Sequence, residues 1–296
     1  MSGALQRLLQ AWRRRGWRPD PERLAAYAAL RPMTVVTGAS EGIGYALARR
    51  FAKGGHDLLL IARREGPLQS AAAAISAEFK VLAVPLPLDV TSGEAIASIE
   101  AALARHSAYA DVLINSAGMG FAGRFEEQTA ESARRLIDLN VGALTLLTRH
   151  FLTGMRVRGR GGVLNLASLG GFAPGPYQAA YYASKAYVLS LSEAVAAEMA
   201  GQGVRVTALA PGPVDTRFHE RMRADTAWYR LLVPPASKES VAQAGYLGFA
   251  LGWRVVVPGL VAPVLALAMR VLPHRLMVPI IQFLLQPRGG EPGAGR

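Results

Sequence analysis

The alternation of short apolar runs with helical stretches after Met33 constrains the fold of this chain more than any other feature. Apolar runs typical of strands occupy residues 33–37, 57–61, 81–88, 111–115, 162–167 and 204–209, and residues 255–257 could add a last strand. Helical stretches separate them at residues 45–53, 65–79, 93–106 and 130–157 and in the segment up to residue 200. Such strict alternation predicts a parallel sheet with helices on both faces. The expected fold class is α/β, a doubly wound parallel sheet.

The turn after the first strand is rich in glycine, with Gly38, Gly42 and Gly44 in the spacing G-x-x-x-G-x-G. The turn opens a helix, whose N-terminus offers free N–H groups and the positive end of the helix dipole. Glycines let the backbone approach a pyrophosphate, so the turn favours a dinucleotide and a Rossmann-type fold. A tight strand-to-helix turn without a ligand is the alternative for the same residues.

Two arginines stand where a dinucleotide fold would distinguish NAD from NADP. The second strand ends in Ala62, Arg63 and Arg64, at the place where an acidic residue would bind the ribose hydroxyls of NAD. A carboxylate would repel a 2′-phosphate, whereas guanidinium groups can bind it through two hydrogen bonds. NADP(H) is therefore the expected cofactor, although one arginine of the two is expected to be a solvated loop charge. Glu41 in the turn adds no affinity for an anion.

Tyr181 precedes Lys185 by four residues near the start of a predicted helix. Residues with this spacing lie on one helix face, so the phenol and the ammonium can point into one site. A neighbouring cation favours the phenolate and lowers the pKa of a phenol from its normal value near 10. The chain has only four lysines and takes nearly all its positive charge from arginine, so a lysine at this position favours a specific role for Lys185. A surface pair on an amphipathic helix is the alternative.

Seven features in order resemble the signature of the short-chain dehydrogenase/reductase family. They are residues 37–44, residues 115–118, Asn140, Ser168, Tyr181, Lys185 and residues 211–216. The resemblance covers residues 33 to 217, and it departs at Ser116, where the family's usual pattern has a second asparagine. The Ala-Arg-Arg segment and the apolar C-terminal stretch resemble NADP(H)-dependent members that reduce ketones, including acyl and steroid-type carbonyls.

The resemblance implies a catalytic set of Asn140, Ser168, Tyr181 and Lys185. Tyr181 would be the general acid in carbonyl reduction and the base in alcohol oxidation, with Ser168 bonded to the substrate oxygen. Lys185 would hold the ribose hydroxyls next to the nicotinamide and lower the pKa of Tyr181. Asn140 would hold a water that links Lys185 to solvent. The alternatives are a loop cap for Ser168 and a locally bonded helix residue for Asn140.

The resemblance also implies a cofactor site along the carboxyl ends of the strands. Asp89 would meet the adenine, residues 115–118 would line its ribose, and Thr216 with the turn at residues 211–212 would hold the carboxamide. A helix cap is the alternative for Asp89. Together with Tyr181 and Lys185, the expected cofactor-binding residues are Gly38, Ser40, Gly42, Ile43, Gly44, Arg63, Arg64, Asp89, Val90, Asn115, Ala117, Gly118, Pro211, Gly212, Val214 and Thr216.

The two ends of the chain differ from the middle. We expect a basic amphipathic extension over residues 1–32, a dinucleotide-binding domain over 33–259, an apolar segment over 260–285 and a disordered tail over 286–296. Prolines and arginines interrupt the apolar segment, which could cover a substrate, pack against a second subunit or lie on a membrane. No secretory signal is recognisable. The expected location is cytoplasmic, with peripheral membrane contact left open, and a homodimer or homotetramer is expected.

These features together predict an NADP(H)-dependent oxidoreductase that interconverts a ketone or aldehyde and an alcohol. Its substrate is expected to be a hydrophobic small molecule, lipid-like or steroid-like. The alternative is a non-catalytic, membrane-associated protein that senses NADP(H), although a sensor has no need of Tyr181. The five histidines lack metal-ligand spacing, and no nucleic-acid motif is present, so we expect neither a metal nor a nucleic-acid partner.

Overall fold

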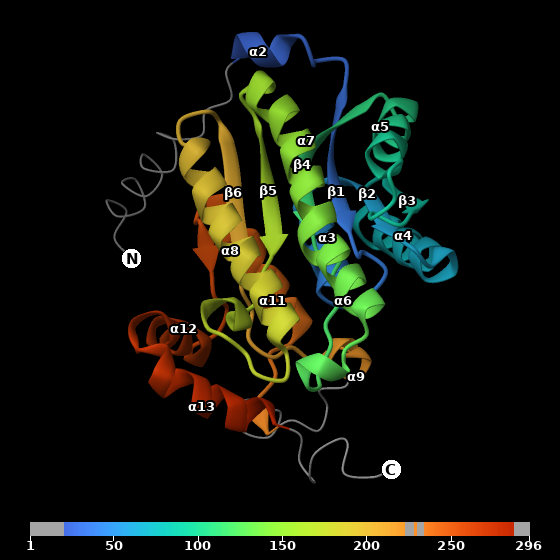
Figure 1. Ribbon diagram of the computed structural model, residues 1–296. Coiled ribbons are helices and arrows are strands. Elements are labelled where there is room, and N and C mark those ends of the chain that lie inside the picture. Colours follow the sequence, from blue (N-terminus) through green and yellow to red (C-terminus); the bar gives the residue numbers. More distant parts are fainter. Residues whose placement is uncertain (1–20, 223–227, 230–233, 287–296) are drawn as a thin grey trace.

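The computed structural model describes residues 21–222, 228–229 and 234–286. In this part of the chain, seven strands form one sheet in the order β3-β2-β1-β4-β5-β6-β7, and every neighbouring pair is parallel (Figure 1). The strands are β1 Arg31–Thr37, β2 Asp57–Ala62, β3 Ala83–Pro87, β4 Ala108–Asn115, β5 Gly161–Leu166, β6 Val204–Leu209 and β7 Val255–Val256. The predicted α/β fold is confirmed.

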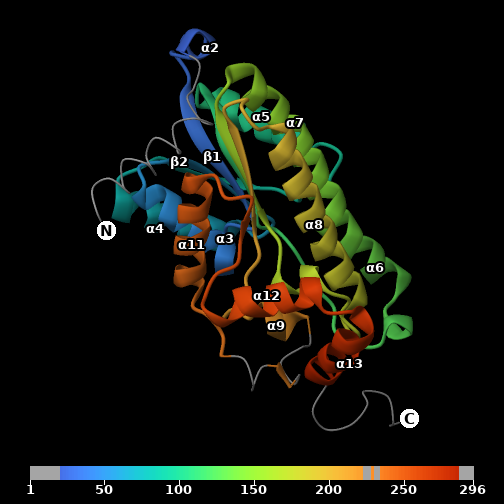
Figure 2. The same cartoon turned by 90° about the vertical axis from the view of Figure 1, so that its left-hand side faces the viewer.

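Helices cover both faces of the sheet, as Figure 2 shows. On one face lie α3 Gly42–Lys53, α4 Glu65–Phe79 and α11 Lys238–Leu251; on the other lie α5 Ala95–Arg105, α6 Ala130–Ile137, α7 Leu144–Arg158 and α8 Ala179–Glu198. The strands are apolar without alternation because both of their faces are buried, as the fully buried run from Leu58 to Ile61 in β2 illustrates. The order of strands reverses between β1 and β4, which is where such folds bind ligands.

Shorter elements gather where the strands end. They are the 3₁₀ turns η1 Phe125–Glu127 and η3 Leu169–Phe172 and the helices α9 Phe218–Arg221, α12 Val261–Val271 and α13 His274–Leu285, while α2 Pro21–Ala25 lies at the opposite end of the sheet (Figure 1). Buried side chains of α12 and α13 form a small core with η3. The apolar C-terminal segment is therefore a pair of helices packed at the carboxyl ends of the strands.

The long helix expected over residues 130–157 is interrupted. A π-helical stretch, η2 Asp138–Ala143, separates α6 from α7. It holds Asn140 fully buried, with its side chain bonded to the backbone of Met119. A wide turn of this kind leaves the apolar period nearly intact, so sequence periodicity does not reveal it. Residues 1–20 of the expected basic extension and residues 287–296 of the expected tail lie outside the described residues.

Candidate active site

A cavity of about 1170 Å³ lies beyond the carboxyl ends of the strands. The glycine-rich turn lines one end of it, and Ser168, Tyr181 and the two C-terminal helices line the other. Of the residues expected to bind the cofactor, all but Asn115 line this cavity; of the four expected catalytic residues, all but Asn140 do. The fold thus brings residues from the whole length of the domain into one continuous space.

The glycine-rich turn needs its glycines for conformational and steric reasons. Gly38 and Gly42 have φ values of 67° and 61°, in the left-handed region that side chains disfavour. A Cβ on Gly44 would lie 2.3 Å from the carbonyl oxygen of Gly38. The Thr37 hydroxyl accepts hydrogen bonds from the backbone of Ser116 and Ala117, at 3.0 and 3.1 Å, and ties the turn to the end of β4. The result is a cradle with room for a pyrophosphate against the start of α3.

Glu41, inside this turn, is held between two arginines. Its Oε1 lies 2.7 Å from Nη2 of Arg64 and 2.5 Å from Nη1 of Arg221, which belongs to α9. The hydrogen bond from Arg221, together with the charges of both arginines, lowers the pKa of Glu41. The carboxylate is therefore ionised at neutral pH and compensated on both sides. The sequence alone does not connect Arg221, about 180 residues further along the chain, to this turn.

Arg63 and Asp89 form the outer edge of the same end of the cavity. Arg63 Nη1 lies 4.0 Å from Asp89 Oδ2, and both side chains are largely exposed. Asp89 accepts hydrogen bonds from the backbone N and the hydroxyl of Thr91, at 3.0 and 2.8 Å. Partial burial acts to raise the pKa of Asp89, but these bonds and the charge of Arg63 lower it overall. Asp89 closes a local turn and is not the cap of α5, whose N-cap is Glu94.

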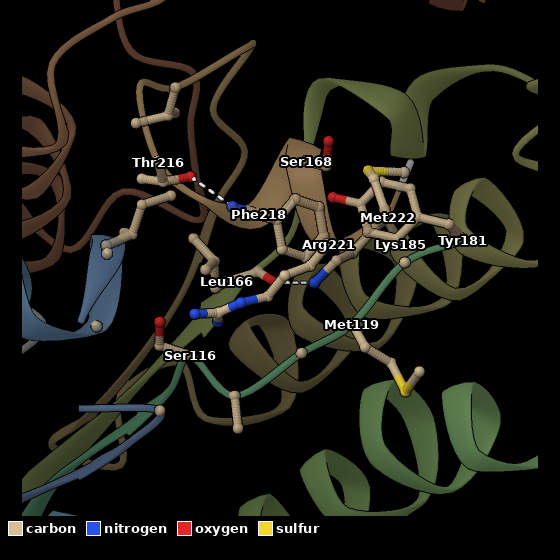
Figure 3. A pocket seen from close by; sticks show the side chains of 18 of the residues that line it. Ser116, Met119, Leu166, Ser168, Tyr181, Lys185, Thr216, Phe218, Arg221 and Met222 are labelled. Carbon is tan, nitrogen blue, oxygen red and sulfur yellow. Dashed lines mark hydrogen bonds between the residues drawn. The ribbon is translucent and has the colours of Figure 1, made fainter. Parts of the chain in front are cut away.

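Tyr181 and Lys185 both face the cavity from the first turns of α8 (Figure 3). The ammonium of Lys185 donates a hydrogen bond to the carbonyl of Leu166 at 2.7 Å, and burial lowers its pKa to about 8. Burial raises the pKa of Tyr181 to about 12, and a hydrogen bond with Ser168 partly offsets this rise. The expected lowering of the Tyr181 pKa by Lys185 is therefore not seen. The Nζ atom lies 5.7 Å from the centre of the phenol ring and bonds elsewhere.

Ser168 caps η3 and also lines the cavity, so the loop-cap alternative does not exclude the predicted role in the site. Its hydroxyl oxygen accepts a hydrogen bond from the backbone N of Gly170 at 3.1 Å and caps η3. Because that bond occupies a lone pair and leaves the hydroxyl hydrogen available, Ser168 can still donate toward Tyr181 or toward a ligand oxygen. The loop cap orients the hydroxyl for the site.

Asn140 lies behind the cavity. Its Oδ1 accepts from the backbone N of Met119 at 2.9 Å, and its Nδ2 donates to the carbonyl of Met119 and to the hydroxyl of Ser184, at 2.8 and 3.1 Å. Ser184 donates in turn to the carbonyl of Tyr181 at 2.7 Å. These bonds are not local within the helix. They join η2 to the loop after β4 and to the turn of α8 that carries Tyr181.

Asn115 lies in the sheet and not in the cavity, contrary to the expectation that it binds the cofactor. Its Nδ2 donates to Thr148 Oγ1 and to Asn165 Oδ1, at 3.0 and 2.9 Å, and the residue is buried. These bonds tie β4 to α7 and β5. The neighbours Ser116, Ala117 and Gly118 do line the cavity, because β4 ends at Asn115 and the chain turns there.

The far end of the cavity is apolar. Tyr182, Phe218, Met222 and Tyr229 line it. The other apolar residues come from the C-terminal helices, where the sequence indicated a possible cover but could not say which side chains face inward; they are Leu265, Met269, Ile281, Leu284 and Leu285.

Comparison with known proteins agrees with this arrangement. The sequence model of the short chain dehydrogenase family matches residues 32–227. Galactitol 2-dehydrogenase (L-tagatose-forming) of Cereibacter sphaeroides is 38% identical over 190 residues, which are 64% of this chain and 73% of that protein. The chain belongs to the short-chain dehydrogenase/reductase family and is an oxidoreductase.

Two solved structures extend the comparison. A short-chain dehydrogenase from Sphingobium yanoikuyae in complex with NADPH is 36% identical, with a TM-score of 0.70 over 76% of this chain and 87% of that chain. The bulky-bulky ketone specific alcohol dehydrogenase from Comamonas testosteroni is 32% identical, with a TM-score of 0.68 over 77% and 86% of the two chains. Both structures are similar to this chain over most of the fold and not only at the glycine-rich turn.

Proposed function

We propose that this protein is an NADP(H)-dependent oxidoreductase that interconverts a ketone or aldehyde and an alcohol on a hydrophobic substrate. The observation that carries the proposal is the position of Tyr181. Its phenol lines one cavity together with Ser168, the glycine-rich turn and apolar side chains of the C-terminal helices. Such a place suits a proton donor that meets both a dinucleotide and a carbonyl compound.

The residues around the cradle fit a nicotinamide dinucleotide. A Cβ on Gly38 or Gly44 would clash with backbone atoms of Ala117 or of the turn itself, so only glycines allow the tight turn that leads into α3. A turn of this kind lets the start of a helix meet a pyrophosphate. Arg63 and Arg64 border this end without a carboxylate at the strand end, which favours NADP(H) over NAD(H). The similar dehydrogenase from Sphingobium yanoikuyae carries NADPH, in line with this preference. When bound, the dinucleotide supplies or takes up the hydride.

The protein side of the chemistry follows from the site. The Tyr181 phenol gives its proton to the carbonyl oxygen during reduction and takes it back during oxidation, while Ser168 donates a hydrogen bond to the same oxygen. Lys185 is held at the end of β5 by Leu166, in reach of ribose hydroxyls beside Gly118. Asn140 holds the loop at Met119 and the turn that bears Tyr181 in register.

The apolar end of the cavity supports a hydrophobic substrate. Met269, Ile281 and Leu285 are buried there, and the Phe218 ring lies beside that of Tyr181, tilted by 48°, with ring centres 5.6 Å apart. In this proposal residues 33–259 form the dinucleotide-binding domain and residues 260–285 cover the substrate. A similar solved protein is described as specific for bulky-bulky ketones, whereas a similar relative acts on galactitol. The lining of this cavity favours the apolar class.

The test is NADPH consumption with a panel of ketones, comparing wild type with Tyr181→Phe. We expect Tyr181→Phe to lose about 100-fold to 10,000-fold in turnover while NADPH still binds. The matched control is Tyr182→Phe, which removes the neighbouring phenol of the same cavity and should keep turnover within a few-fold. Equal turnover of Tyr181→Phe and wild type on every active ketone would refute the proposal and favour the non-catalytic alternative.

The substrate class has its own test. In a series of 2-alkanones of increasing length, kcat/KM should rise about fourfold for each CH₂ that enters the apolar end, since burial of a CH₂ contributes about 0.8 kcal/mol. Ile281→Asn should flatten that rise without changing the affinity for NADPH. A series in which short polyols outperform long ketones would overturn the hydrophobic assignment and leave the oxidoreductase assignment intact.

A further inference from the structure

The outward sides of α12 and α13 expose an unusual amount of apolar surface. Among the described residues, seventeen large apolar side chains are exposed, and nine of them lie between residues 260 and 283. Leu260 is 93% exposed, Val264 66%, Leu267 63% and Ile280 53%. We name these nine residues the α12–α13 face: Leu260, Val261, Val264, Leu267, Val271, Leu272, Leu276, Ile280 and Phe283. Soluble monomers rarely expose a large group of apolar side chains on consecutive helices without a use for it.

The two helices are apolar on both of their sides. On α13 the residues Met277, Ile281 and Leu285, spaced by four, are buried against the protein, while Leu276 and Ile280 point away from it. On α12 Ala266 and Met269 are buried, whereas Val261, Val264, Leu267 and Val271 are exposed. A surface helix normally turns polar residues to water. Packing within the fold therefore accounts for one side of each helix and for Phe283, whose ring stacks on that of Trp228.

The charge of this segment has one sign. Between residues 240 and 290 the chain contains no aspartate or glutamate, but it contains Arg254, Arg270, Arg275 and Arg288. Arg275 and His274 are exposed on the first turn of α13, directly beside Leu276. Arg270 is held by Glu193 of α8, with Nη2 and Oε1 2.5 Å apart. Exposed leucines and isoleucines next to arginine, without acids, are complementary to an apolar layer that has an anionic rim.

A lipid surface fits these observations better than a second copy of the chain. In a twofold contact each patch meets itself, so the arginines of one copy would face those of the other without an acidic partner in the segment. The helices are also too short to cross a bilayer, and no helix in the described ranges is long and apolar enough to do so. Helices of this length can instead lie along the boundary between headgroups and acyl chains.

We propose that the α12–α13 face docks on the surface of an anionic phospholipid bilayer, with both helices parallel to the membrane plane. In this orientation Leu267 and Ile280 enter the acyl region, and Arg275 meets the lipid phosphates. The inward sides of the same helices line the apolar end of the cavity through Leu265, Met269 and Ile281. Docking therefore brings the cavity within one helix diameter of the lipid, at the end of the molecule that Figure 1 shows below the sheet.

The test is co-sedimentation of the full chain with sucrose-loaded vesicles of phosphatidylglycerol and phosphatidylcholine, and with vesicles of phosphatidylcholine alone. Wild type should partition at least about tenfold more strongly to the anionic vesicles. The double variant Leu267→Glu with Ile280→Glu should lose about tenfold or more in the partition coefficient, because two carboxylates replace side chains that enter the acyl region in the docked state. The control is Leu247→Glu, which places a carboxylate at an exposed leucine of α11 and should bind like wild type.

Two readouts exclude other occupants of the face. Size-exclusion chromatography with light scattering should give the same mass for wild type and the double variant; a variant of lower mass that never bound vesicles would identify a second copy as the occupant and overturn the proposal. The full-chain variant Leu8→Glu with Trp12→Glu changes the basic N-terminal extension. If that variant lost vesicle binding while Leu267→Glu with Ile280→Glu kept it, the proposal would also fall. Equal binding to neutral vesicles would overturn the anionic assignment.

Discussion

The guanidinium of Arg221 bonds to the carboxylate of Glu41, with Nη1 and Oε1 2.5 Å apart, and so connects α9 to the glycine-rich turn. Arg64 approaches the same carboxylate oxygen from the end of β2. Glu41 therefore gathers two cations at the place where the proposed cofactor would put its phosphates. An anionic ligand that binds there meets the Glu41 carboxylate as well as the two guanidinium groups.

Replacing this carboxylate should strengthen NADPH binding. Glu41→Gln keeps the size of the side chain, removes the negative charge and leaves Arg64 and Arg221 free to face the phosphates. The Kd for NADPH should fall by roughly threefold to tenfold at low salt, and the gain should shrink as salt is added. Fluorescence titration measures this. Glu78→Gln, which breaks the pair with Arg49 outside the cavity, is the control and should leave the Kd unchanged. Weaker binding by Glu41→Gln would show that the carboxylate positions the arginines.

The two arginines after β2 should contribute unequally to NADP preference. Arg64 is engaged with Glu41 at 2.7 Å, whereas Arg63 is 67% exposed and has Asp89 only at 4.0 Å. Arg63→Ala should therefore weaken NADPH binding by about tenfold or more and leave NADH binding nearly unchanged, because one charge-assisted contact to the 2′-phosphate is lost. Arg64→Ala should have the smaller effect. Parallel titrations with both dinucleotides decide the order, and no change in either variant would refute the 2′-phosphate assignment.

The sequence predicts the sheet and most of the cavity because the relevant residues follow strand ends. Gly38, Asp89 and Ser168 come one or two residues after a strand, Thr216 lies in the loop that follows β6, and parallel strands bring their carboxyl ends together. Asn115 is the exception: it is the last residue of its strand, and its side chain turns into the sheet instead of the cavity. Which way the side chain of the last strand residue points depends on where the strand ends, and the motif does not specify that position.

Contacts between distant segments could not be predicted. The approach of Arg221 to Glu41 depends on how α9 folds back, and the bond from Lys185 to Leu166 depends on the depth at which α8 crosses β5. The depth of burial could not be predicted either. The sequence suggested that Lys185 would lower the pKa of Tyr181, but burial has the largest effect on the pKa of both groups. Local spacing places two side chains on one face, but the surroundings decide their electrostatics.

Ser168→Ala should slow catalysis and shift its pH dependence. The hydrogen bond from Ser168 lowers the pKa of Tyr181, so its loss should raise that pKa further. Alcohol oxidation needs the phenolate, so its rate rises with pH, and in Ser168→Ala the rise should move upward by about one pH unit. The kcat should also fall by about 100-fold to 1,000-fold because a donor to the substrate oxygen is missing. Ser168→Thr keeps the hydroxyl and should restore the wild-type pH profile. If Ser168→Ala lost rate without a shift of the pH profile, Ser168 would act on the substrate oxygen and not on the pKa of Tyr181.

Asn115→Ala should affect stability and not cofactor affinity. The substitution leaves Thr148 and Asn165, both buried, without a hydrogen-bond donor that they now have. The free energy of unfolding should fall by about 1–3 kcal/mol. Urea denaturation measures this loss, and NADPH titration should give a Kd within about twofold of wild type, since Asn115 does not line the cavity. A large loss of NADPH affinity in a stable variant would restore the direct contact that the sequence suggested.

Lys185→Met should remove activity and yet change the pH dependence of stability in a defined direction. Burial lowers the pKa of Lys185 from 10.5 to about 8, so between these values the unfolded chain carries a proton that the folded protein lacks. The contribution of Lys185 to stability is therefore most unfavourable below pH 8 and improves as the pH rises toward 10.5. Methionine has no such dependence. The stability of Lys185→Met relative to wild type should thus be greater at pH 7 than at pH 10, by up to about 3 kcal/mol.

Chemical denaturation of wild type and Lys185→Met at both pH values measures this difference, because every other titrating group is common to the two proteins. Lys53→Met, at the exposed end of α3, is the control and should follow wild type at each pH. Parallel pH profiles for Lys185→Met and wild type would mean that the ammonium is not penalised by burial. In that case the bond to Leu166 would compensate fully for the lost hydration, and Lys185 would be charged at neutral pH without cost to the fold.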